Sequence, residues 1–174
     1  MKQLLIAVVV VLIVLAVLAV RPLLRGNADI STDTAGVRVV LYGLWGPRYT
    51  VGPTTEARTV KAGIYRPAEL FRELKKGAET WQLYSQGPWG NLERINVKEG
   101  EATVLSFGDQ LKVGVDTTTD RYDRVVYLSL KLTGPYGETY SPLIKRNGKN
   151  VDAPGFVIYD EAGKELAVGK FAYG

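Results

Sequence analysis

The pattern of hydrophobic and polar residues changes twice along the chain, and its first region is entirely apolar. Residues 4–20 form a run of seventeen positions, each of them Leu, Ile, Val or Ala. As a helix this run spans about 26 Å, close to the hydrocarbon core of about 30 Å. A helix buried in a soluble core would show a polar face. We therefore predict a transmembrane signal anchor over residues 1–25.

The flanking residues of this run suggest where the remainder of the chain lies. Lys2 precedes the run, while Arg21 and Arg25 follow it. A very short N-terminal tail normally stays in the cytoplasm, so we expect a single-pass protein of the cell membrane with its domain outside. The alternative is a cleaved signal peptide with its cleavage site at residues 17–19. The residues expected to contact lipid, or identical helices, are Leu4, Leu5, Ile6, Val10, Leu12, Ile13, Leu15 and Leu18.

Beyond the apolar run the chain becomes polar and then alternates. Residues 26–36 are rich in Gly, Asp, Ser and Thr, which predicts a flexible linker. From Val37 the apolar residues recur at every second position, as expected for strands. Residues 37–174 are therefore predicted to form one β domain. Two Gly-Pro pairs interrupt residues 43–53 and predict a long loop or sheet edge there.

One short segment has the spacing of a helix. Residues 67–76 begin with Pro67, carry an apolar stripe that includes Leu70 and Phe71, and end in two lysines before Gly77. Proline suits a first helical turn, lysines suit the last turn, and glycine suits the position after it. We predict a short helix that lies across the end or edge of the sheet and has a packing role.

The rest of the domain shows repeated strand signals separated by turns. Residues 95–98 and 102–107 predict a hairpin, residues 111–115 and 126–132 alternate clearly, and residues 155–159 and 164–173 flank a turn with Gly163. Seven or eight short strands at this spacing are typical of a β-sandwich, and a small barrel is the alternative. The predicted fold is mainly β, with an N-terminal transmembrane helix followed by one immunoglobulin-like β-sandwich and one short helix.

A resemblance supports the sandwich. Residues 138–142 read Glu-Thr-Tyr-Ser-Pro, and residues 154–174 contain Gly-Phe-Val-Ile-Tyr-Asp-Glu-Ala-Gly-Lys and end in Gly-Lys-Phe-Ala-Tyr-Gly. This quarter of the chain resembles the closing strands of immunoglobulin-like β-sandwich domains in exported, membrane-anchored bacterial proteins. The resemblance implies the fold and carries no catalytic residue.

Composition narrows the chemistry available. The chain has neither histidine nor cysteine, so it lacks the commonest general base and any thiolate or disulfide. The net charge is +4, but without Lys2, Arg21 and Arg25 the 22 basic residues become 19 against 18 acidic ones. This balance gives no reason to expect nucleic-acid binding. We predict a protein that is not an enzyme.

Two groups of residues are candidate sites. Asp116, Asp120 and Asp123 are candidate calcium ligands at a turn, although their spacing differs from that of an EF-hand. The alternative is a solvated loop, and no other cofactor is expected. Trp45, Tyr49 and Trp89 are candidate contacts for a protein or glycan partner, because aromatic rings on loops offer stacking surfaces. Their alternative role is to cover the ends of the sandwich.

These features lead to one main functional hypothesis and two alternatives. The main hypothesis is a membrane-anchored extracytoplasmic protein with a binding or structural role. The first alternative is a pilin-like subunit whose apolar helices bundle into a filament core, which would make it a homo-oligomer. The second alternative is a carbohydrate-binding module or a hydrolase that works without histidine. The expected partners are membrane lipid or identical helices, and a protein or glycan for the domain.

Overall fold

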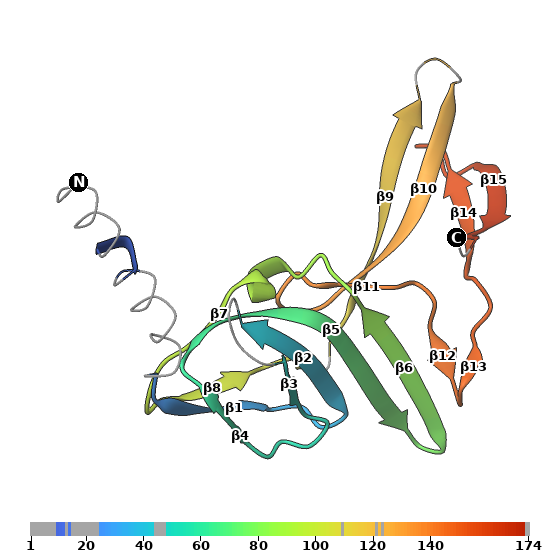
Figure 1. Ribbon diagram of the computed structural model, residues 1–174. Helices are drawn as coiled ribbons and strands as arrows, with labels where there is room; N and C mark the ends of the chain where they lie inside the picture. The colour runs from blue at the N-terminus through green and yellow to red at the C-terminus, as the bar shows by residue number, and fades with distance from the viewer. Residues whose placement is uncertain are drawn as a thin grey trace.

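The computed structural model describes residues 10–12, 14, 25–43, 48–108, 110–120, 122 and 124–172 (Figure 1). The chain is mainly β, as predicted, and one 3-10 helix, η1 (Gly90–Glu93), accompanies the strands in the described parts. Of the predicted anchor, residues 10–12, 14 and 25 are described, and the first four of these are helical and exposed. Within the described residues, no helix has the length and apolar character needed to cross a membrane.

The largest sheet has seven strands and forms one side of the body. Its order is β13-β12-β6-β5-β2-β3, and β7 pairs with β5. The central pairs β3-β2, β2-β5 and β5-β6 are all antiparallel. The strands are β2 (Val37–Gly43), β3 (Arg48–Val51), β5 (Gly63–Lys76), β6 (Glu79–Ser85), β7 (Ile95–Val97), β12 (Lys145–Arg146) and β13 (Lys149–Asn150).

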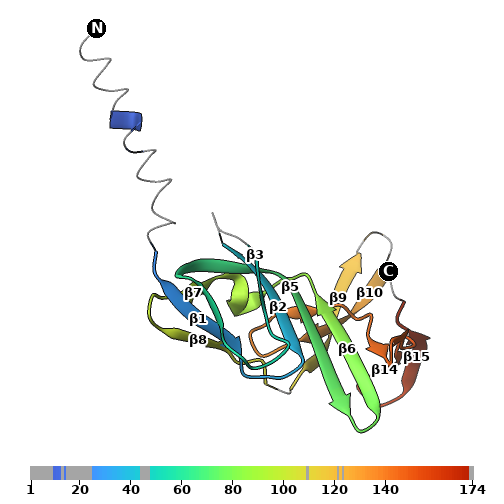
Figure 2. The ribbon, with the colours of Figure 1, turned by 60° about the horizontal axis from the view of Figure 1, so that its bottom comes forward.

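A three-stranded sheet supplies the other wall of the core. It has the order β4-β1-β8 and comprises β1 (Asn27–Thr32), β4 (Arg58–Lys61) and β8 (Ala102–Leu105). Alternate residues of β1 and β2, such as Ile30 and Val39, are fully buried. They join Leu70 of β5 and Leu105 of β8 in a single hydrophobic cluster. The core therefore lies where these two sheets face each other (Figure 2).

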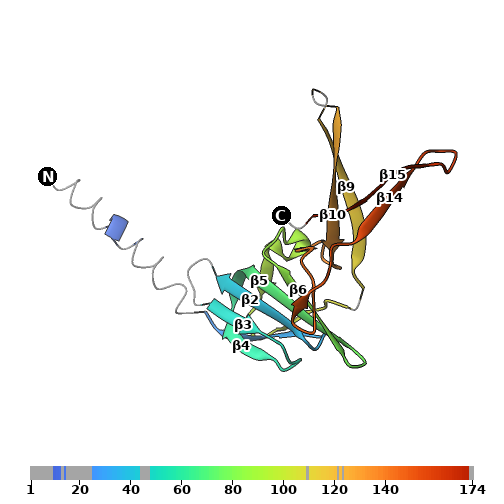
Figure 3. The same ribbon diagram turned by 90° about the vertical axis from the view of Figure 1, so that its right-hand side faces the viewer.

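Two hairpins project from this body. One contains the long strands β9 (Lys112–Asp120) and β10 (Val125–Thr133), and β10 also pairs with the short β11 (Thr139–Tyr140). The other contains β14 (Gly155–Tyr159) and β15 (Glu165–Lys170), which form a two-stranded sheet. Figure 3 shows the two hairpins leaving the body on the same side and diverging towards their tips.

The predicted helix over residues 67–76 is wrong, because this segment is the second half of β5. Leu70 and Arg72 are buried on the core side, and Phe71 between them lies on the other side. Pairing with β2 and β6 satisfies the backbone along both edges, which local helix signals cannot match. Gly77 has φ +63° and opens the tight turn into β6 instead of ending a helix.

Two further predictions about local structure need correction. Residues 26–36 contain β1, whose Ala28 and Ile30 are buried in the core, so this segment is not only a linker. Residues 95–98 and 102–107 contain the strands β7 and β8, but these strands do not form a hairpin. β7 pairs with β5, and β8 pairs in parallel with β1. Pairing between segments distant in sequence leaves little trace in local periodicity.

Several predictions are confirmed. The alternating segments near residues 37–42, 111–115 and 126–132 are strands. The closing hairpin is also present, with Gly163 at φ +80° in its turn. Asp160 stabilises that turn, since its Oδ1 accepts hydrogen bonds from the backbone N–H groups of Ala162 and Lys164.

Candidate functional site

A cleft of about 590 Å³ lies between the two projecting hairpins. One wall is β10 and the other is the β14–β15 hairpin, with Phe171 and Ala172 following β15 into the lining. The side chains that define this cleft are mainly apolar: Val126, Leu128, Leu130, Phe156, Ile158 and Phe171. We call this space the hairpin cleft. It is open to solvent.

The wall on the β10 side follows from strand alternation. Leu128 pairs with Thr117 and Leu130 with Val115, so these residues share one face of the β9–β10 hairpin. The opposite face carries an ion pair of 3.5 Å between Lys131 and Asp116, beside Tyr127 and Ser129. The face with Leu128 and Leu130 is therefore the more apolar one, and on β10 it lines the cleft.

The wall on the β14 side is apolar on both of its faces. Residues 156–159 read Phe-Val-Ile-Tyr, which is the continuous pattern of a strand covered from two sides. Phe156 packs against Phe171, with ring centroids 5.1 Å apart. Gly169 lies opposite Phe156 in the register, and a side chain there would collide with the ring of Phe156. The glycine thus allows the ring to lie against β15.

The cleft suits an extended apolar segment of polypeptide. A two-stranded sheet is only marginally stable by itself and gains from a third strand. β14 and β15 pair only with each other among the described residues, so each leaves one backbone edge without a strand partner. Exposed edges of this kind accept an added strand through main-chain hydrogen bonds, and the apolar pockets beside them select alternate side chains. This arrangement favours binding over chemistry.

A buried polar group holds the root of the β9–β10 hairpin. Glu138 and Tyr140 are almost completely buried, and Tyr140 Oη donates a hydrogen bond of 3.0 Å to Glu138 Oε1. The backbone N–H of Tyr136 donates to the other carboxylate oxygen over 2.9 Å. Arg72 of β5, also fully buried, donates to the carbonyl oxygen of Gly108 just before β9. These contacts connect the large sheet to the hairpin.

The charge of this group affects the phenol of Tyr140. Burial is the largest cause and raises the pKa of Tyr140 well above its ordinary value, because the ionised form loses its hydration. The carboxylate of Glu138 raises this pKa further, while the guanidinium of Arg72 lowers it. The phenol therefore stays protonated and acts as a hydrogen-bond donor. Its depth in the core indicates a structural role.

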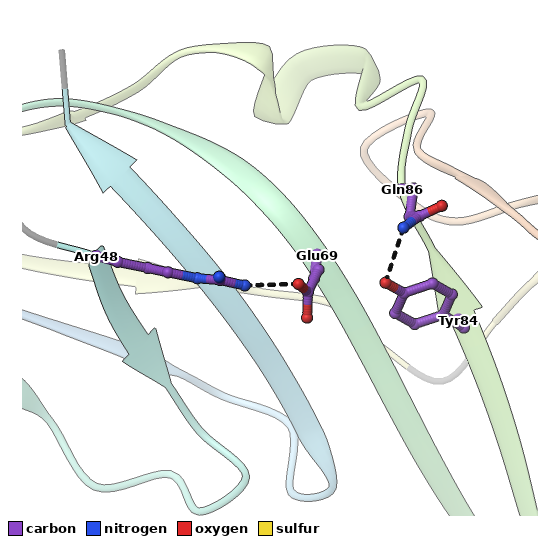
Figure 4. A network of polar contacts seen from close by, with 4 residues as sticks. All are labelled: Arg48, Glu69, Tyr84 and Gln86. Carbon is purple, nitrogen blue, oxygen red and sulfur yellow. Dashed lines mark hydrogen bonds and ion pairs between the residues drawn. The ribbon is translucent and has the colours of Figure 1, made fainter.

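The outer face of the large sheet is a second polar surface, shown in Figure 4. Arg48 of β3 reaches Glu69 of β5 with an N–O distance of 2.5 Å, and Gln86 Nε2 donates to Tyr84 Oη over 3.1 Å (Figure 4). Beside them the guanidinium of Arg38 lies 5.3 Å from the ring centre of Phe71. That cation occupies a ring face which a sugar would need for stacking, so we favour the hairpin cleft as the candidate site.

The predicted aromatic contacts lie elsewhere. An exposed Trp89 is expected from the sequence, but only 9% of it is accessible and it belongs to the hydrophobic core. Tyr49 is half-buried and packs edge-on against Tyr65 with centroids 5.8 Å apart. Trp45 lies outside the described residues. The structure does not bring Tyr49 or Trp89 to the cleft.

The predicted calcium ligands are spread along a strand. Asp116 and Asp120 belong to β9 rather than to a turn, four residues apart on one face, which separates them by about 13 Å. Asp116 faces Lys131, and Asp120 Oδ1 accepts a hydrogen bond from the N–H of Tyr122. Asp123 lies outside the described residues. Within the described part of the chain, no three carboxylates converge on a common point that could hold a metal ion.

For the residues that line the cleft, the sequence predicts strands but not a site. The alternation over residues 126–132 predicted a buried face, and the run over residues 156–159 predicted a strand. Neither pattern showed that the two faces would meet at an open cleft. One signal was available, since a continuous apolar run in a predicted hairpin implies a cover on both faces.

Comparison with protein-family models, with curated proteins and with solved structures gave no match. The function is therefore argued from the geometry of the site.

Proposed function

We propose that this chain is a membrane-anchored extracytoplasmic protein whose β domain, related to immunoglobulin-like sandwiches, binds a partner polypeptide in the hairpin cleft. It acts by binding and performs no catalysis. The apolar run over residues 4–20 supports the anchor. The resemblance of residues 154–174 supports the relation to exported sandwich domains.

One observation carries the binding proposal. Two hairpins present apolar side chains to each other across a space of about 590 Å³, and that space is open to solvent. Exposed apolar patches of this kind mark interaction sites in soluble domains. The partner that fits is an extended strand with apolar residues at alternate positions, because the walls are themselves strands with that spacing.

A fluorescent peptide tests this proposal directly. The probe is a ten-residue peptide that has two Glu at each end and alternating Val and Thr between them. Its binding to the full-length chain is followed by fluorescence anisotropy. We expect Ile158→Glu to weaken binding at least tenfold, because it places a charge among apolar groups. Val157→Glu is the matched control, since Val157 is the next residue, has a similar exposure of 42% against 38%, and does not line the cleft.

A second probe separates strand addition from general stickiness. A peptide with proline at every second Val position is still extended but cannot donate the same backbone hydrogen bonds. We expect it to bind at least tenfold more weakly than the original peptide. Equal binding of both peptides, or an equal effect of Ile158→Glu and Val157→Glu, would contradict the proposed site.

A further inference from the structure

The outer edge of β9 lacks the proline and the bulge that often protect an exposed strand, although the strand carries the charged residues Lys112, Asp116 and Asp120. β9 is the last strand of the order β11-β10-β9, and no strand in the described residues pairs with its outer edge. It pairs with β10 through nine consecutive residues without a bulge. It contains no proline, and its one lysine, Lys112, is at its start. Such an edge is a template for pairing with another chain.

The exposed valines of β9 show that the hairpin cleft does not cover this edge. Val113 and Val115 lie on the apolar face of the hairpin, yet they are 69% and 50% exposed. The lining of the cleft comes from β10, β14 and β15, and not from β9. These two valines are therefore available to a partner that comes alongside β9.

Strand geometry restricts how β9 can pair with a second β9. A twofold axis perpendicular to the sheet keeps the apolar faces of both copies on the same side. Two residues that face each other across the new pair must then point to the same side of the sheet, so the residue at the axis faces the same residue of the second copy. An axis at Asp116 would pair Lys112 with Asp120, but it would oppose two aspartates at the axis, which is unfavourable. An axis at Val115 would pair Lys112 with Thr118 and would leave Asp116 opposite Gly114.

An axis at Gly114 pairs residues 112–116 of the two copies without a conflict. It places Lys112 opposite Asp116 of the second copy, twice by symmetry, and Val113 opposite Val115 on the apolar face. Gly114 faces Gly114, and the space beside it is open, since an added Cβ would meet no atom within 4 Å. Opposite charges and apolar pairs at facing positions both stabilise antiparallel strands.

We infer that a second copy of this chain pairs antiparallel with β9 about Gly114, which joins two three-stranded sheets into one of six strands. The observation that selects this partner is the self-complementary sequence Lys-Val-Gly-Val-Asp at an unprotected edge. The inference goes beyond the proposed function, because it requires neither the anchor nor a peptide in the cleft.

Single cysteines test the register, because the chain contains none of its own. The full-length protein in detergent is oxidised mildly and analysed on a non-reducing gel. Gly114→Cys should form a disulfide-linked dimer, whereas Asp116→Cys and Thr118→Cys, on the same face of β9, should remain mainly monomeric. Absence of the Gly114→Cys dimer, or stronger cross-linking through Asp116→Cys or Thr118→Cys, would overturn the proposed register.

Charge reversal tests the same pairing without a covalent bond. Lys112→Asp alone and Asp116→Lys alone should each raise the dimer dissociation constant about tenfold, since two like-charge pairs replace two opposite pairs. The double variant should recover most of the loss. Analytical ultracentrifugation of the full-length chain in detergent measures the constants, and thermal unfolding confirms that each variant is folded. A double variant that dimerises no better than the weaker single variant would contradict the pairing.

Discussion

Glu138 shows at the scale of one residue how the hairpins are attached to the body. Its carboxylate is fully buried and accepts hydrogen bonds from the phenol of Tyr140 and the N–H of Tyr136. A buried charge is tolerated only when such partners replace its hydration. No pattern in the sequence indicates this arrangement, because residues 134–150 have the composition of a loop and Glu138 resembles a surface glutamate there.

The phenol of Tyr140 leads to a prediction about alkaline pH. Its pKa is raised in the folded protein, so the unfolded chain loses this proton first as the pH rises above 10. The protonated phenol makes its full contribution to the free energy of unfolding below pH 10. Above pH 10 this contribution declines by about 1.4 kcal/mol per pH unit. Urea unfolding should therefore show a steeper loss of stability above pH 10 for the wild type than for Tyr140→Phe.

The same variant supplies its own control at neutral pH. Tyr140→Phe removes the donor to Glu138, so it should lower the free energy of unfolding by about 1–3 kcal/mol at pH 7. The difference between the two proteins should then shrink above pH 10. A difference that stays constant up to pH 11.5 would show that the phenol does not titrate abnormally in the folded state.

At the scale of the element, β5 shows how partners decide between helix and strand. Its second half carries a proline, an apolar stripe and a terminal glycine that together indicate a helix, but β2 and β6 lie on either side of it. The alternation of Leu70, Phe71 and Arg72 between core and surface is the pattern of a strand. A short segment of this kind is compatible with the residue patterns of both a helix and a strand. Pairing with neighbouring strands decides which of the two structures forms.

Two neighbouring substitutions test the strand. A helix would place Leu70 and Phe71 on the same stripe, whereas a strand puts them on opposite faces. Leu70 is fully buried, so Leu70→Ala should cost about 2–5 kcal/mol of unfolding free energy. Phe71→Ala, on the half-exposed face, should cost no more than about 1 kcal/mol. Similar costs for both in denaturant unfolding would contradict the strand.

The strands were easier to predict than their pairing. Alternation located β2, β9 and β10, and the continuous apolar run over residues 156–159 located β14. The parallel pairing of β1 with β8 joins segments more than seventy residues apart, and periodicity carries no information about it. For the same reason the cleft could not be predicted, since it depends on where two separate hairpins meet.

At the scale of the whole molecule, the proposed anchor and the β domain have separate tests. The wild type should stay with membranes washed in alkaline carbonate. Val10→Asp combined with Val14→Asp should release it, because aspartate near the middle of a span costs about 2.5–3.5 kcal/mol on insertion scales. Val10→Leu with Val14→Leu is the matched control and should remain in the membrane fraction.

Other results of this fractionation would contradict the anchor in different ways. Finding the wild-type protein in the cytosol would contradict both the proposed anchor and the predicted location outside the cytoplasm. A soluble product whose intact mass corresponds to a start at Val20 would indicate a cleaved signal peptide. Fibres in electron micrographs would favour the filament subunit instead.

The polar contacts of Arg72 and Glu138 lie at the root of the β9–β10 hairpin, which makes that hairpin a lever. Nine strand residues give it an arm of about 30 Å. One degree of rotation at the root then moves the tip by about 0.5 Å, while the buried groups at the root move very little. A polypeptide segment bound between the two hairpins would restrict the rotation of the β9–β10 hairpin. Binding in the hairpin cleft would therefore exert a torque on the large sheet through the root of this hairpin.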